Sequence, residues 1–217
     1  MQPSSGIPNL YLLETLDSIK CATALEKALS GDVGKARKEP LAVYLQVNTS
    51  GEEAKGGLEP LTDPSDASIS EIVSLAKHVM SECPNLRLQG VMTIGAATNS
   101  KASQESLSQD GQSAKDIAEE ACRLNPDFAR LNETRSNLVK AIRSDSEQLK
   151  SCEERYSTLL TGTQDEGGLE LSMGMSNDLE VAIRAGSDNV RVGTDCFGVR
   201  PPSRDEAMAG MKDELEE

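Results

Sequence analysis

The sequence predicts an α/β fold in which short parallel strands are joined by crossover helices. Five short apolar runs stand along the chain, and several are almost continuously apolar, as in strands that are buried on both faces. Segments in which apolar residues recur with helical spacing lie between these runs. This alternation of strand and helix is typical of a parallel sheet whose strands are connected through helices.

The predicted strands begin with the run LYLLETL and end with the run NVRVG. In chain order they are Leu10–Leu16, Leu41–Asn48, Leu86–Ile94, Leu169–Met173 and Asn189–Gly193. Strands of this length are common in globular proteins, and the gaps between them are long enough for helical crossovers.

The clearest helical pattern lies between the second and third predicted strands. Ser68 and Glu71 have the spacing of a capping box, in which two side chains satisfy the free N–H groups at the start of a helix. Ile69 and the apolar residues after it, up to Met80, recur at three- and four-residue intervals. These features predict a helix that begins near Ser68.

Three further helices are predicted in the C-terminal half of the chain. A long, highly charged helical pattern runs from Phe128 to Leu159. Ser176 is predicted to cap a helix that Gly186 ends, because serine favours the start of a helix and glycine its end. Ser203 opens a last short helix.

Residues 1–217 are expected to form a single domain. Residues 98–121 are rich in Ser, Gln, Asp and Lys, which predicts a polar surface insertion with at most one late helical turn. Residues 205–217 form an acidic C-terminal tail.

The charge balance excludes several classes of binding protein. The 217 residues contain 22 Lys and Arg against 36 Asp and Glu, which gives a formal net charge of −14. A sequence-independent nucleic-acid binder needs surplus cations, and so does a protein that docks on an anionic membrane. No apolar run approaches the roughly 20 residues that span a bilayer, and the N-terminus does not resemble a signal peptide. The expectation is a cytoplasmic protein, with a mitochondrial pool as a second location.

The five cysteines are an odd number and lack CxxC spacing. Buried reduced thiols are therefore expected, rather than a disulfide framework or a zinc site. The sequence contains no metal-ligand constellation, no GxGxxG fingerprint and no Walker A motif. His78, the one histidine, falls between the apolar positions of its helix, is expected to be exposed, and offers no Ser–His or Cys–His arrangement.

The segment LSMGMSND, residues 171–178, is the most informative part of the sequence. A strand ends there, Gly174 allows a sharp turn and Ser176 begins a helix, so that backbone N–H groups are presented to an anion. A second turn of this kind follows at residues 190–194, VRVGT. Two adjacent turns form a phosphate cradle, which in (βα)8 barrels commonly follows the last two strands. The alternative is that both are ordinary polar turns.

Two more residues stand near the ends of predicted strands. Asn48 could hold a ligand or fix the polar loop that follows it, and the structural role is the more common of the two. Met92 could line one wall of a pocket, although a methionine in a strand is more often part of the core.

Several of these segments resemble one known family. The runs LAVYLQVNTSGEEAKGGL, LRLQGVMTIGAATN, LSMGMSNDLEVAIRAGSDNVRVGT and FGVR are similar to the pyridoxal phosphate homeostasis proteins, which are related to the N-terminal barrel of alanine racemase. The likeness covers most of residues 7–98 and 169–200, and it is looser at residues 125–135. It implies an α/β (βα)8 TIM barrel of the alanine racemase N-terminal type, of which about five of the eight strands are present here.

The resemblance also implies that the C-terminal mouth of the barrel binds pyridoxal 5′-phosphate. Carried over by position, the cofactor-binding residues are Ser172, Gly174, Met175, Ser176, Arg191, Gly193 and Thr194. The two serines and the backbone between them would bind the phosphate, and Gly193 and Thr194 would complete the cradle. Arg191 would approach the pyridine nitrogen, where an arginine disfavours the protonated ring and weakens the cofactor as an electron sink.

The sequence departs from the family pattern in one respect. Family members carry a lysine on their first strand, in a segment resembling AVSKT, which forms a Schiff base with the aldehyde of the cofactor. This segment and the FGEN-like and HFIG-like segments after it do not occur here, so the chain is expected to be a truncated product or a fragment. Lys20, Lys35, Lys55 and Lys77 fall in predicted helices or loops, and none is nominated as a replacement.

The function implied by the resemblance is pyridoxal phosphate binding in intracellular vitamin B6 homeostasis. The protein would store and deliver the cofactor without turnover, would not be an enzyme, and would have apo pyridoxal phosphate enzymes as partners. One alternative is a racemase-like enzyme that uses the cofactor, which the absence of a lysine and tyrosine acid/base pair disfavours. The other is a truncated remnant that binds nothing. We expect weak, reversible binding without a Schiff base.

An open arc of five strands would leave two sheet edges and an apolar interior exposed. We therefore expect a poorly soluble monomer or a weak dimer.

Overall fold

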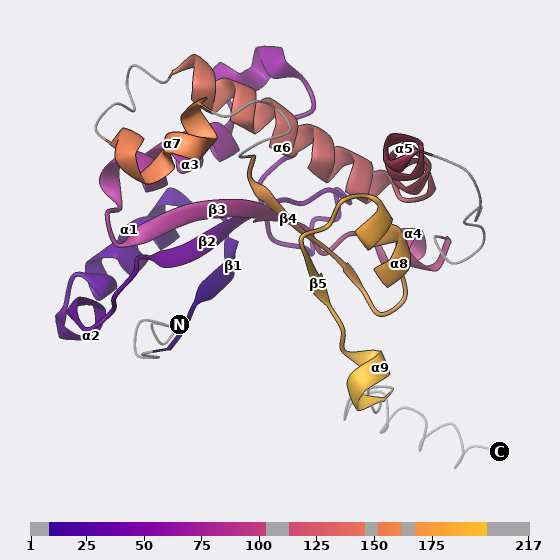
Figure 1. The fold of residues 1–217 in the computed structure, drawn as a ribbon, viewed down its shortest axis with the longest axis horizontal. Helices are drawn as coiled ribbons and strands as arrows, with labels where there is room; N and C mark the ends of the chain where they lie inside the picture. Colours follow the sequence, from indigo (N-terminus) through magenta and orange to yellow (C-terminus); the bar gives the residue numbers. More distant parts are fainter. Residues whose placement is uncertain (1–8, 103–112, 146–151, 162–167, 199–217) are drawn as a thin grey trace.

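The computed structural model describes residues 9–102, 113–145, 152–161 and 168–198, which contain one five-stranded sheet (Figure 1). The strands are β1 (Leu12–Leu16), β2 (Leu41–Gln46), β3 (Leu86–Met92), β4 (Glu170–Met175) and β5 (Asn189–Arg191). Their order in the sheet follows the chain, and each neighbouring pair is parallel. The five predicted strands and their parallel order are confirmed, and the fold is an α/β half-barrel.

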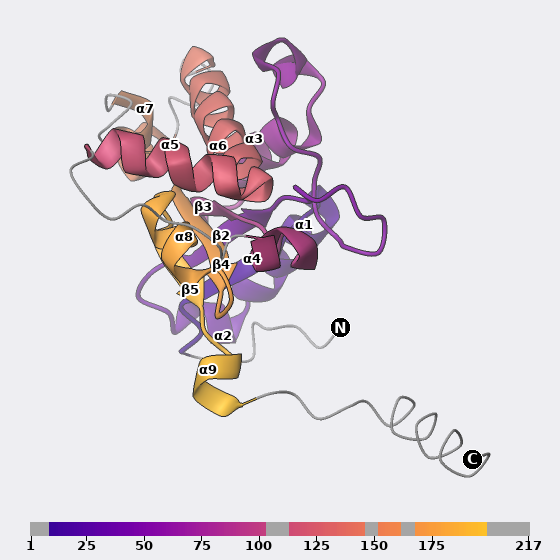
Figure 2. The same cartoon turned by 90° about the vertical axis from the view of Figure 1, so that its right-hand side faces the viewer.

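Helices lie between the strands in the chain, and one short helix follows β5. They are α1 (Ile19–Leu29), α2 (Asp32–Lys35), the 3-10 helix η2 (Pro64–Ser68), α3 (Glu71–Glu82), α4 (Ala97–Ala102), α5 (Ala114–Leu124), α6 (Pro126–Ser144), α7 (Glu153–Thr161), α8 (Leu179–Arg184) and α9 (Thr194–Phe197). Figures 1 and 2 show α3, α6 and α7 close together, and α3 and α6 also contact the central strands.

The core lies between this helical layer and the sheet. Strand β2 is buried along its whole length, as its almost continuous apolar run predicts. Aliphatic side chains of β2, α3 and α6 form the centre of the core, among them Leu41, Val43, Leu45, Ile72, Val79, Leu138 and Ile142. The core is mostly aliphatic, because the chain has 2 Phe, 3 Tyr and no Trp, and Tyr44, Phe128 and Tyr156 are its buried aromatic residues.

Polar side chains connect strands on the sheet and contradict the expected apolar interior. Glu14 on β1 accepts hydrogen bonds from Ser172 on β4 (2.8 Å) and from Asn189 on β5. Glu170 on β4 accepts hydrogen bonds from Tyr44 on β2 and from Gln89 on β3 (2.8 Å). Since Glu14 reaches strands that are not its neighbours, the sheet must curl enough to bring β1 close to β4 and β5. The prediction of an exposed apolar interior is wrong, because these polar groups satisfy one another across the curved sheet.

The predicted capping box before α3 is wrong. Helix α3 begins at Glu71, with Ser70 in the N-cap position and no side-chain cap. Ser68 instead ends η2, which starts at Pro64 and is capped by the Asp63 carboxylate through the backbone N–H of Ser65 (2.8 Å). Proline sets the backbone angle that the first turn of a helix needs, so a separate helical turn forms here.

Two other helix predictions differ from the structure. The single long pattern from Phe128 to Leu159 is divided between α6 and α7, with residues 146–151 outside the described part. Within residues 98–121, α4 and α5 are helical, and a capping box at Ser113 starts α5. Helix α5 packs on α6 and α8, so the expectation of one late helical turn is wrong. The predicted Ser203 helix and the acidic tail at residues 205–217 lie outside the described residues.

The cysteines are free thiols, but the expectation that all are buried is wrong. Cys83 and Cys152 are buried, whereas Cys196 is exposed on α9. Burial raises the pKa of the Cys83 thiol to about 11, because the thiolate would lose its hydration, and the charge of Glu26 adds to this effect. Cys83 is therefore a core residue rather than a reactive one.

Candidate functional site

Two turns meet at the carboxyl edge of the sheet. The first follows Met175 at the end of β4, and the second follows Arg191 at the end of β5. A cavity of about 490 Å³ opens between them, and its walls are Met175, Ser176, Asn177, Arg191, Val192, Gly193 and Thr194. Adjacent parallel strands end at the same edge of a sheet, which is why turns so far apart in sequence share one cavity.

The Ser176 hydroxyl joins the two turns. Its oxygen accepts hydrogen bonds from the backbone N–H of Gly193 (3.2 Å) and of Asp195 (3.4 Å). Two N–H groups thus converge on one oxygen atom, an arrangement that anion-binding sites in proteins also use. The prediction that Ser176 caps the following helix is wrong, because α8 begins after Asp178 and Ser176 bonds to the other turn.

A buried carboxylate holds the first turn in shape. Asp178 accepts hydrogen bonds from the backbone N–H of Met175 (2.6 Å) and from the hydroxyl of Ser100 on α4. The Met175 N–H is directed at this carboxylate and is therefore not directed into the cavity. Met175 lines the cavity wall, but its backbone N–H is already used. Sequence reasoning missed Asp178, although it follows Ser176 in the same polar run.

Gly174 allows β4 and α8 to approach closely. Its φ is +94°, and a Cβ atom built there would lie 2.3 Å from the Cβ of Ala182 on α8. No side chain fits without a shift of the helix, and the positive φ is itself unfavourable for residues other than glycine. Gly174 does not line the cavity. Its geometry explains the close packing of α8 on β4, and not a ligand contact.

Ser172 also lies outside the cavity walls. Its side chain is fully buried, and its hydroxyl donates to Glu14. This bond is part of the polar network that closes the curved sheet. The structure therefore brings Met175, Ser176, Arg191, Gly193 and Thr194 together around the cavity, and places Ser172 and Gly174 behind it.

Arg191 supplies the positive charge of the site. One Nη donates to the backbone oxygen of Thr93, beyond the end of β3, and the other lies 3.7 Å from the sulfur of Met92. The Nε is buried and has no hydrogen-bond partner among the described residues. Burial lowers the pKa of Arg191, and the charges of Glu14 and Asp178 oppose this effect. A buried donor without a partner is costly, and a ligand acceptor would satisfy it.

Asn48 fixes the loop that follows β2. Of the two roles predicted for Asn48, the structural one is therefore confirmed. The Asn48 amide donates to the backbone oxygens of Glu52 (3.0 Å) and Lys55 (3.1 Å), and its oxygen accepts from Gly51 (3.1 Å). Lys55 lies in this loop as predicted, and its Nζ donates to the oxygen of Gly95, beyond the end of β3 (2.7 Å). Sequence reasoning did not find that Lys55 reaches the carboxyl edge of the sheet, because a contact over 40 positions is not visible in a local pattern.

Met92 and His78 do not act as separate sites. Met92 is buried and lies beside Arg191, so it forms core behind the site. His78 on α3 is partly buried rather than exposed, and shares a hydrogen bond with Thr23 on α1 (3.1 Å). In the described ranges no cluster of His, Cys, Asp and Glu is arranged to hold a metal ion. Within the same ranges, no helix has the length and apolar character needed to cross a bilayer.

The sequence is similar to curated proteins of several eukaryotes and bacteria. It is 35% identical to the pyridoxal phosphate homeostasis protein of Homo sapiens, over 97% of this chain and 60% of that protein. It is 36% identical to the protein of the same name from Schizosaccharomyces pombe, over 92% of this chain and 60% of that protein. The chain therefore spans about 60% of the length of these relatives. No family model matches the sequence.

Solved structures also resemble the chain. An unknown protein from Bifidobacterium adolescentis is 30% identical, with a TM-score of 0.48 over 86% of this chain and 52% of that one. PipY of Synechococcus elongatus with PLP bound is 19% identical, with a TM-score of 0.46 over 86% of this chain and 60% of that one.

Proposed function

Because this chain belongs by sequence to the family of the pyridoxal phosphate homeostasis proteins, we propose that it binds pyridoxal 5′-phosphate in the cavity between the β4 and β5 turns. The curated relatives are named for pyridoxal phosphate homeostasis, and the chain matches them over nearly its whole length. The observation that carries the proposal is the convergence of the Gly193 and Asp195 N–H groups on the Ser176 oxygen. We propose that a phosphate oxygen lies beside this hydroxyl and accepts from the same two N–H groups.

The donor set of the cavity fits a phosphate group. Backbone N–H groups and the hydroxyls of Ser176 and Thr194 are able to donate to the phosphate, and the guanidinium of Arg191 in the same cavity wall is able to donate to the ring nitrogen. The buried Nε of Arg191 supplies a donor that the described residues leave unused. Ser176 can exchange its acceptor role toward the two N–H groups for a donor role toward the ligand, since a hydroxyl does both. Met175 and Val192 form the apolar part of the wall.

A role in storage and delivery, without turnover, fits this site better than catalysis. When bound, the cofactor supplies an aldehyde and a ring that withdraws electrons. Arg191 is a permanent cation and a donor, so beside the ring nitrogen it would disfavour the protonated, strongly withdrawing ring. The proposed partners are apo enzymes that receive the cofactor, in the cytoplasm, and the proposed binding is weak, reversible and not covalent.

Substitution of Arg191 or Ser176 by alanine is expected to weaken pyridoxal phosphate binding about tenfold or more, because each change removes a hydrogen bond to a charged group. Equilibrium titration followed by the absorbance and fluorescence of the cofactor measures this. Unphosphorylated pyridoxal should bind much less well than the phosphate ester to the unchanged protein. Borohydride treatment should leave no cofactor attached to the chain.

Two matched substitutions control for loss of charge and loss of a hydroxyl. Arg184→Ala removes an arginine that pairs with Glu180 on α8 (2.7 Å), and Ser74→Ala removes an exposed hydroxyl on α3. Both controls should bind as the parent does. Equal binding by Arg191→Ala, Ser176→Ala and the parent would refute the proposed site. Equal affinity for pyridoxal and its phosphate ester would refute phosphate recognition.

A further inference from the structure

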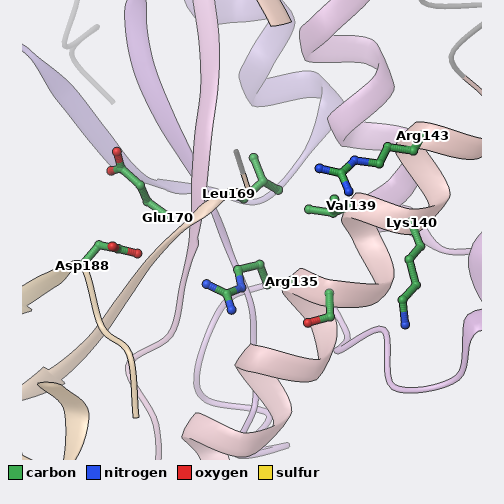
Figure 3. A pocket seen from close by; sticks show the side chains of 9 residues that line it. Arg135, Val139, Lys140, Arg143, Leu169, Glu170 and Asp188 are labelled. Carbon is green, nitrogen blue, oxygen red and sulfur yellow. The ribbon is translucent and has the colours of Figure 1, made fainter. Parts of the chain in front are cut away.

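A second cavity of about 490 Å³ lies at the opposite, amino edge of the sheet (Figure 3). One wall is α6, and the other is formed by the start of β4 and the turn before β5. None of the residues that line it lines the cavity between the β4 and β5 turns. A ligand in this second cavity would therefore contact none of the residues that line the first cavity.

The α6 wall carries positive charge. Arg135, Lys140 and Arg143 project from this helix, and Arg135 is partly buried. The hydrogen bond of the Arg135 guanidinium is a long one, 3.4 Å, to the side chain of Asn132 on its own helix. Arg135 forms no ion pair among the described residues. Burial lowers the pKa of its guanidinium, and the negative charge of Asp188 opposes that effect. A desolvated guanidinium without a close carboxylate is stabilised by an anionic partner.

The opposite wall carries negative charge. Asp188 accepts a hydrogen bond from the backbone N–H of Leu171 (2.8 Å), and Glu170 accepts from Tyr44 and Gln89. Each carboxylate has more lone pairs than these contacts use. Figure 3 shows the Arg135 guanidinium and the Asp188 carboxylate pointing toward one another across the cavity. Cationic and anionic groups thus face each other without forming an ion pair.

An apolar surface completes the cavity. Val139 on α6 and Leu169 before β4 line it, and both are more than nine-tenths buried. Figure 3 shows these two side chains between Arg135 and Arg143. A purely anionic ligand would be repelled by Glu170 and Asp188, and a purely cationic one by the three basic side chains of α6.

We propose that this cavity binds a zwitterion of the α-amino acid class with an apolar side chain. The ligand carboxylate pairs with Arg135, its ammonium pairs with Asp188, and its side chain packs on Val139 and Leu169. Such a ligand uses both charged walls and the apolar surface at once, and it satisfies the guanidinium that the described residues leave without a carboxylate.

Binding of leucine, measured by calorimetry and by ligand-observed NMR, tests the proposal. Saturable binding is expected at concentrations up to about 10 mM, the weak range for a small ligand in an open cavity. Isocaproate lacks the ammonium and isoamylamine lacks the carboxylate, so each should bind at least tenfold more weakly than leucine. Arg135→Gln and Asp188→Asn should each weaken leucine binding by at least tenfold. Arg184→Gln, at a partly buried arginine of α8 that does not line this cavity, should leave leucine binding unchanged.

Three results would overturn the proposal: no saturable leucine binding, binding of isocaproate as strong as that of leucine, or unchanged binding by Arg135→Gln and Asp188→Asn. The leucine titration is repeated on Arg191→Ala, which removes the proposed contact with the ring nitrogen of the cofactor and should leave leucine binding intact. This measurement separates the two proposals, because Arg191→Ala should weaken pyridoxal phosphate binding and leave leucine binding unchanged. A failure of one proposal can then be distinguished from a failure of the other.

Discussion

Replacement of Gly174 by alanine is expected to lower the free energy of unfolding by about 2–5 kcal/mol. The backbone there has a φ of +94°, which costs an L-residue roughly 1–2 kcal/mol. The new Cβ would also lie 2.3 Å from the Cβ of Ala182, so α8 must move away from β4, and overpacking of this kind costs about 1–3 kcal/mol. Urea denaturation followed by circular dichroism measures the change.

Gly186 provides the matched control. Its φ is +92°, close to that of Gly174, but a Cβ atom there meets nothing within 4 Å. Gly186→Ala should therefore show the cost of the backbone alone, about 1–2 kcal/mol. Addition of Ala182→Gly to Gly174→Ala should recover part of the lost stability, because it removes the Ala182 Cβ atom with which the new Cβ at position 174 would clash. Equal losses for Gly174→Ala and Gly186→Ala, or strictly additive effects in the double variant, would contradict the packing argument.

Arg155→Met is expected to destabilise the fold by about 2–3 kcal/mol, because a charged group that makes several hydrogen bonds is lost. From α7, the Arg155 guanidinium donates to the backbone oxygens of Met80 (3.2 Å), Pro84 (3.0 Å) and Leu86 (3.2 Å). It also lies 5.3 Å from the centre of the Tyr156 ring. These bonds satisfy carbonyl groups between the end of α3 and the start of β3, where the helix has no partners of its own.

Arg184→Met tests whether any arginine would have this effect. Arg184 pairs with Glu180 four positions away on the same helix, and because the Glu180 side chain is largely exposed, loss of this pair should cost less than about 0.5 kcal/mol. Thermal and urea denaturation of both variants give the comparison. An Arg155→Met variant no less stable than Arg184→Met would show that the contacts of α7 with the α3–β3 connection contribute little.

The strands and the two turns could be predicted because their signals are local. The almost continuous apolar run at Leu41–Gln46 marks a strand buried on both faces, and it forms β2. Gly174 and Gly193 mark turns at strand ends, and parallel order places both turns at one edge. Strand β4 extends to Met175, beyond its predicted end at Met173, so that Gly174 lies inside the strand, where the pairing of β4 with β5 is irregular.

The long-range contacts could not be predicted, because no local pattern contains them. Glu14 is a single charged residue in an apolar run, and its bonds to Ser172 and Asn189 depend on how strongly the sheet curls. The role of Ser176 depends in the same way on the distance between two turns. A serine before a helix usually caps it, and here a tertiary contact replaces the local one.

The central claim is that the turns after β4 and β5 hold the phosphate group of the cofactor. Backbone amide NMR of the labelled chain tests this claim most directly, because the N–H groups of Gly193 and Asp195 are the proposed donors. Addition of pyridoxal 5′-phosphate is expected to shift the signals of these two amides strongly, and pyridoxal at the same concentration should leave them nearly unchanged. If both amides keep their positions at saturating cofactor while signals elsewhere shift, the phosphate is bound at another place and the account is contradicted.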